Sequence, residues 1–231
     1  MFLRAIFLLL LNTGLAQACA TALVISLDVS KSVDKHEYVL MRNGIARALI
    51  EDDVIALLTS APGGTLITVA QWASTGQQNQ SIPWRHINVA GDVIGLAENL
   101  AQMPRDYVWT DTSQSEALLH AALLLDHAPQ ECARKIIDLS TDGISNAGPP
   151  PDAIATSLGR RGITINGLIV TGHKPDPVRY FRQHIRSGPL AFVEQANSYD
   201  SYFHAMRRKL LRELRPVISA APPADLFAKP G

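Results

Sequence analysis

The sequence lacks several features that would point to common functions. Its 21 basic and 21 acidic residues leave no net charge at pH 7, which argues against a nucleic-acid-binding surface. It contains no Gly-x-Ser-x-Gly motif of a serine hydrolase, and no internal repeat. His36, His173 and His184 do not have the spacing of a zinc site. Beyond the first 18 residues, no apolar run is long enough to predict a membrane span.

The first 18 residues have the pattern of a secretory signal peptide. Arg4 is their only charge, residues 5–11 form an apolar core, and Ala-Gln-Ala at 16–18 suits a signal peptidase. Because the apolar core is too short to span a membrane comfortably, we expect cleavage after residue 18 and an exported protein, periplasmic or secreted. Acylation of Cys19 is a weaker alternative, since Ala16 stands where lipoprotein signals usually carry leucine.

The rest of the chain alternates strand-like and helix-like segments. Residues 22–27 form a nearly unbroken apolar run, which is typical of a strand buried on both faces. Residues 77–84 are polar and contain a proline, which favours an edge strand paired with residues 66–72. We therefore predict an α/β fold: a doubly wound, mostly parallel sheet with one antiparallel edge strand and helices on both faces.

The domain boundaries follow from the same pattern. About 213 residues remain after the predicted cleavage, which suits one domain with a sizeable core. We expect this domain to cover residues 19–215. Residues 216–231 are rich in alanine and proline and are predicted to be a disordered tail.

Oxygen-bearing side chains gather at the ends of the predicted strands. Asp28, Ser30 and Ser32 alternate after the first strand, so their side chains can converge on one point. Asp142 follows a second apolar strand, and Thr112 precedes a helical run. Such strand ends bind ligands in open α/β sheets, and hard oxygen ligands suit Mg²⁺, Mn²⁺ or Ca²⁺. Taken singly, each aspartate or serine would more often cap a helix.

Together these residues resemble the metal-ion-dependent adhesion site of von Willebrand factor A domains. The resemblance rests on Asp-x-Ser-x-Ser at 28–32, on Thr112 five residues before Ala117-Leu118, and on Thr-Asp-Gly at 141–143. Over about residues 21–214 the chain also resembles a bacterial family of exported A-like proteins with no assigned function. The resemblance implies that three hydroxyls contact the ion directly and that two aspartates act mostly through water.

The resemblance implies an adhesion-type protein-binding module rather than an enzyme. An Asp or Glu carboxylate of a partner protein would fill the coordination position that the five side chains leave open. The alternative is a metal-dependent hydrolase or phosphatase that uses Asp28 as nucleophile, but such enzymes usually carry a second acid where Ser30 stands. Asp111 departs from the Gly-Gly-Thr of many A domains, and it is either an accessory charge near the ion or a solvent-facing carboxylate.

Cleavage after residue 18 would leave two cysteines in an oxidising compartment. Cys19 precedes Asp28 by nine residues, and Cys132 precedes Asp142 by ten. In A-like domains the first and fourth strands are adjacent and parallel, so the resemblance implies a Cys19–Cys132 disulfide. Cleavage after Ala20, or lipidation of Cys19, would exclude this bond.

Two further expectations concern charged residues away from the strand ends. Asp138 lies in an apolar strand, so a structural role with buried partners is predicted for it. The basic residues of the last helix are predicted to form a solvated face: Arg207, Arg208, Lys209, Arg212 and Arg215.

Overall fold

The computed structural model describes residues 18–172 and 174–216. The predicted signal peptide, apart from its last residue, and the predicted tail after residue 216 lie outside the described residues, as does residue 173. In chain order the elements are β1 (Cys19–Asp28), α1 (Lys35–Leu49), α2 (Asp52–Ser60), β2 (Thr65–Trp72), β3 (Gln78–Ile87), α3 (Ala90–Gln102), α4 (Gln114–Asp126), β4 (Cys132–Thr141), α5 (Asp152–Arg160), β5 (Ile163–Val170), α6 (Pro177–His184), β6 (Val193–Ala196), the 3₁₀ turn η1 (Tyr199–Ser201) and α7 (Tyr202–Leu214).

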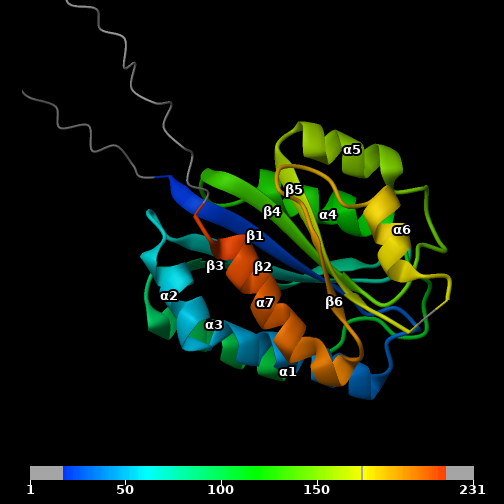
Figure 1. The fold of residues 1–231 in the computed structure, drawn as a ribbon, viewed down its shortest axis with the longest axis horizontal. Coiled ribbons are helices and arrows are strands. Elements are labelled where there is room, and N and C mark those ends of the chain that lie inside the picture. The colour runs from blue at the N-terminus through cyan, green and yellow to red at the C-terminus, as the bar shows by residue number, and fades with distance from the viewer. Residues whose placement is uncertain (1–17, 173, 217–231) are drawn as a thin grey trace, which may run out of the picture.

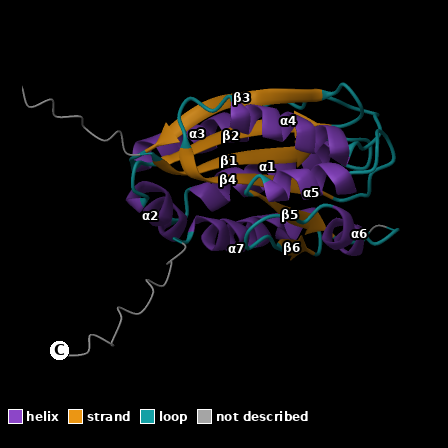
Figure 2. Cartoon of the chain, turned by 90° about the horizontal axis from the view of Figure 1, so that it is seen from above, coloured by secondary structure: helices purple, strands orange, loops and turns teal. Residues whose placement is uncertain are grey.

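The six strands form one sheet in the order β3-β2-β1-β4-β5-β6, which Figure 2 shows from above. Among the strand pairs of the described residues only β2–β3 is antiparallel, and β3 lies at an edge of the sheet as predicted. The chain winds outward from β1 to β3, returns to β4 beside β1, and winds outward again to β6. The predicted doubly wound fold is therefore confirmed, and its switch point lies between β1 and β4.

Helices cover both faces of the sheet because side chains alternate along each strand. From β1, Leu23, Ile25 and Leu27 join the apolar core under α1, α2, α3 and α7. Ala22 and Val24 point to the other core, under α4, α5 and α6. Figure 1 shows these two helical layers on opposite sides of the strands. None of the helices described is long and apolar enough to cross a membrane.

The start of α1 is set by a local signal in the sequence, the capping-box spacing of Asp34 and Glu37. Asp34 and Glu37 form a capping box in which each side chain accepts a hydrogen bond from the other's backbone N–H. The apolar residues that repeat at helical spacing along α1 are buried: Tyr38, Met41, Ile45, Ala48 and Leu49. The helix is interrupted at residues 50–51, and a second helix, α2, begins at Asp52.

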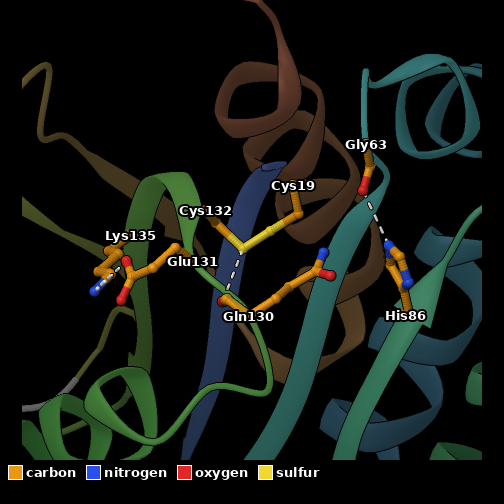
Figure 3. Close-up of a disulfide and its surroundings, with 7 residues drawn as sticks. All are labelled: Cys19, Gly63, His86, Gln130, Glu131, Cys132 and Lys135. Carbon is orange, nitrogen blue, oxygen red and sulfur yellow. Dashed lines mark hydrogen bonds and ion pairs between the residues drawn. A yellow bond between two sulfur atoms is a disulfide. The ribbon is translucent and has the colours of Figure 1, made fainter. Parts of the chain in front are cut away.

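The predicted disulfide between Cys19 and Cys132 is present (Figure 3). The two residues are directly paired in the β1–β4 ladder, with their Cα atoms 4.4 Å apart. They begin their strands, so they lie at the opposite end of the sheet from Asp28 and Asp142. The disulfide therefore fixes the two central strands at the end remote from the candidate metal site.

The prediction that the basic residues of the last helix are all solvated is wrong for Lys209. Its side chain is fully buried, and its Nζ lies 2.6 Å from Asp138 Oδ1 and also contacts Glu213. Glu213 in turn accepts a hydrogen bond of 2.7 Å from the Asn166 side chain. α7 packs this face against the sheet, so Lys209 supplies the buried partner that Asp138 was expected to need.

Candidate metal centre

The end of β1 is shaped by short-range hydrogen bonds. Asp28 Oδ1 accepts a hydrogen bond of 2.8 Å from the Ser30 backbone N–H, which bends the chain immediately after the strand. The Arg105 guanidinium donates to the carbonyls of Val29 (2.8 Å) and Ser30 (2.9 Å). The loop after β1 is thus held both by its own aspartate and by a residue 75 or more positions away.

The structure brings all five predicted residues together at the switch point. The Thr112 hydroxyl donates to Ser30 Oγ at 2.9 Å, and Ser30 Oγ lies 3.4 Å from Ser32 Oγ. The Ser32 hydroxyl donates to Asp142 Oδ1 at 2.6 Å. Oxygen atoms from the β1 end, the β4 end and the loop before α4 therefore form one cluster.

Burial of this cluster disfavours the charged forms of its two aspartates. Asp28, Ser30 and Asp142 are fully buried, Thr112 is nearly so, and only Ser32 is exposed. Burial, and then the negative charge of Asp142, raise the pKa of Asp28 to about 7, although hydrogen bonds from Ser30 and Thr141 act in the opposite direction. In the part of the chain that the structure describes, Asp28 forms no salt bridge. A cation beside Asp28 would offset both causes of this shift.

The donor set fits a hard divalent cation. Two carboxylates and three hydroxyls offer only oxygen atoms, which Mg²⁺, Mn²⁺ and Ca²⁺ prefer. Within residues 18–172 and 174–216 no three His, Cys, Asp or Glu side chains gather as a metal site, so the hydroxyls of Ser30, Ser32 and Thr112 are essential to the fit. Ion binding by these residues stays a prediction.

Three supporting residues were missed by the sequence analysis. Thr141 donates its hydroxyl to Asp28 Oδ2 at 2.6 Å, and its place directly before Asp142 was a possible signal. Asn146 accepts the Thr112 backbone N–H at 2.7 Å and so positions that threonine. Arg105 lies in an irregular loop, where no local pattern marked it.

Asp111 lies exposed beside Thr112. No hydrogen bond or ion pair found within the described chain involves its side chain, and its accessory role near an ion stays a prediction.

Comparison with known proteins places this fold. Residues 18–218 match the model of a family described as "Protein of unknown function (DUF1194)". No curated protein matches the chain. One similar structure is proximal thread matrix protein 1 from the mussel byssus, solved with zinc in its MIDAS (metal-ion-dependent adhesion site) motif. It is 19% identical with a TM-score of 0.64, over 86% of this chain and 46% of that one.

Two bacterial structures are similar in the same way. A von Willebrand factor type A protein from Catenulispora acidiphila is 18% identical with a TM-score of 0.61, over 84% of this chain and 43% of that one. An aerotolerance-related membrane protein from Bacteroides fragilis NCTC 9343 is 17% identical with a TM-score of 0.53, over 84% and 100%. This chain spans less than half the length of the mussel and Catenulispora chains. At these identities the comparisons establish a von Willebrand factor A-like fold.

Proposed function

The chain belongs to the DUF1194 family of proteins of unknown function, and from its oxygen-rich site we propose that it is an exported, metal-dependent protein-binding module of the adhesion type. Its binding domain covers residues 19–215. Mg²⁺, or Mn²⁺ or Ca²⁺ in its place, binds at the switch point of the sheet. An Asp or Glu carboxylate of a partner protein completes the coordination of the ion.

The observation that carries this proposal is the convergence of three hydroxyls. Ser30 Oγ lies within 3.4 Å of Ser32 Oγ and within 2.9 Å of Thr112 Oγ1, although Thr112 comes from a distant loop. Hydrogen bonds between neutral hydroxyls add little stability, whereas together the three hydroxyls offer three neutral ligands on one side of a cation. We assign Ser30, Ser32 and Thr112 as the direct ligands.

The two carboxylates act one step further out. Both oxygens of Asp28 already accept hydrogen bonds, from Ser30 N and from Thr141 Oγ1, so Asp28 holds a coordinating water with its remaining lone pairs. Asp142 orients the Ser32 hydroxyl. A divalent ion bound there would keep one open coordination position on its solvent-facing side. Because the direct ligands are neutral, that position favours an anionic oxygen from the partner.

The zinc in the MIDAS motif of the mussel protein supports a divalent ion at this fold position in general. The choice of Mg²⁺ rests on the donor set of this chain, which has neither thiolate nor imidazole among the five residues.

The hydrolase alternative is less well supported. A nucleophilic aspartate must reach its substrate, whereas Asp28 is fully buried and both of its oxygens are engaged. Release of phosphate from a generic phosphate ester with Mg²⁺, if it disappeared in Asp28→Ala, would establish an enzyme and overturn the proposed function.

Affinity capture tests the binding module. The immobilised protein is incubated with the envelope fraction of its own organism in Mg²⁺ and eluted with a chelator. We expect specific proteins to be retained by the wild type and by Ser157→Ala, which removes an exposed hydroxyl on α5, but not by Thr112→Val. Retention that is indifferent to the chelator or to Thr112→Val would contradict the proposal.

A further inference from the structure

The loop between α3 and α4 is held at both ends but exposes an apolar tip. Near its start, the Met103 carbonyl accepts a hydrogen bond of 3.0 Å from the Tyr38 hydroxyl. Near its end, the Thr110 carbonyl accepts one of 2.9 Å from the Lys31 backbone N–H. Between these anchors the side chains of Val108 and Trp109 are 54% and 81% exposed. The fixed ends therefore present two large apolar side chains to solvent beside the candidate metal centre.

The backbone of Trp109 is also unusual. Its φ is +61°, in the left-handed region that bulky residues rarely adopt. Such a conformation persists only where the surrounding structure imposes it, and it is concentrated at functional sites. Neither burial nor local backbone preference explains why a tryptophan stands at this position.

The loop tip borders a hollow of about 410 Å³ next to the candidate metal ligands. Apolar and basic residues make up most of its lining: Val33, Val108, Trp109, Lys31, Lys35 and Arg105. Asp34 also lines the hollow, but its carboxylate accepts a hydrogen bond from the Glu37 backbone in the α1 capping box. The hollow thus combines an apolar surface with a net positive charge.

We propose that this hollow receives a large apolar side chain from the partner protein. That side chain belongs to the same segment whose carboxylate completes the coordination of the metal ion. The inference rests on the proposed function and specifies its partner as a protein segment with an Asp or Glu and, a few residues away, an aromatic or large aliphatic residue. Lys31 lies between Ser30 and Ser32 and lines the hollow, so the hollow adjoins the candidate metal ligands. One partner segment can therefore contact both the ion and the hollow. The basic rim attracts an acidic segment, and Trp109 provides the type of side chain that dominates binding energy at interfaces.

Peptide selection tests this assignment. Random short peptides displayed on phage are selected on the full-length protein in Mg²⁺ and eluted with EDTA. We expect the eluted peptides to share an acidic residue and an aromatic or large aliphatic residue at a fixed spacing. Selection on Trp109→Ala should retain the acidic residue and lose the apolar one.

A synthetic peptide from the wild-type selection makes the test quantitative. We expect it to bind Trp109→Ala at least about 10-fold more weakly, as for a central interface tryptophan, with unchanged Mg²⁺ affinity. Leu190→Ala is the matched control because Leu190 is also exposed (73%) with a φ of +57°, but it lies by the start of β5, away from the metal centre. This control should bind the peptide as the wild type does.

The outcomes separate the two proposals. The assignment of the hollow would be overturned by acidic peptides without a shared apolar position, or by equal peptide affinity of Trp109→Ala and wild type. Either result would leave the proposed metal-dependent module intact. A wild-type selection without Mg²⁺-dependent acidic peptides would overturn the proposed function and this inference with it.

Discussion

The disulfide offers a quantitative test of the fold, because the chain it closes is long. Cys19 and Cys132 are separated by 113 residues, so the bond removes much of the conformational freedom of the unfolded chain. The chain-entropy relation gives about 4–5 kcal/mol for a loop of this length at 25 °C. Replacing both cysteines by alanine should therefore lower the unfolding free energy by about 3–5 kcal/mol, since measured effects often fall below this relation.

Urea unfolding followed by circular dichroism measures this loss. With a slope of about 2.5 kcal/mol per molar urea, the midpoint should fall by roughly 1.2–2 M. The slope itself should rise, because the unfolded chain without the cross-link is more expanded and exposes more surface. Mg²⁺ affinity should not change, since the disulfide lies at the opposite end of β1 and β4 from Asp28 and Asp142.

The single variants sharpen this test. Either Cys19→Ala or Cys132→Ala removes the whole bond, so each single variant should lose nearly as much stability as the double variant. Additive losses would show that the two residues contribute by separate packing. A loss below about 1 kcal/mol in the double variant, or two free thiols in the oxidised wild type, would refute the reasoning.

Two further predictions concern the core. Lys209→Met leaves Asp138 without its cation, so we expect this variant to lose about 3–5 kcal/mol of unfolding free energy at about pH 8. The loss should be smaller at about pH 5, because burial raises the pKa of Asp138 to about 7. Because the pKa of Asp138 is higher in the folded protein than in the unfolded chain, its protonated carboxyl contributes stability to the wild type. This contribution is complete below about pH 4 and is lost as pH rises through 7. Equal losses at both pH values in urea unfolding would contradict this. Gly167→Ala places a Cβ 2.6 Å from the Phe181 ring and should cost about 1–3 kcal/mol by calorimetry. Gly95→Ala in α3 meets no atom within 4 Å and should gain about 0.5–1 kcal/mol, and the opposite order would contradict the packing.

Local signals in the sequence were sufficient to predict much of the fold and the gathering of the candidate ligands. The apolar run before Asp28 marks a buried strand, and the polar residues after it mark its end. The capping spacing of Asp34 and Glu37 marks the start of α1. Because each of these signals lies within a few residues, none depends on how distant segments meet.

The features that escaped prediction depend on such meetings. The apolar period of α7 includes Tyr202, Met206 and Leu210, which puts Lys209 beside a buried face, but its charge argued for solvent. Asp138 on β4 and Glu213, one turn along α7, together make its burial acceptable, and no local pattern pairs Lys209 with Asp138. The exposure of Trp109 likewise follows from loop anchors on α1 and after β1.

Isothermal calorimetry with Mg²⁺ tests the central claim most directly. The wild type should bind the ion, Thr112→Val should bind it at least about 10-fold more weakly because it loses a direct hydroxyl ligand, and Ser157→Ala should bind it as the wild type does. Thermal unfolding should show the same order, because an ion that binds only the folded state raises the melting temperature. Equal affinity of Thr112→Val and wild type, or no binding by the wild type, would contradict the assignment of the metal centre.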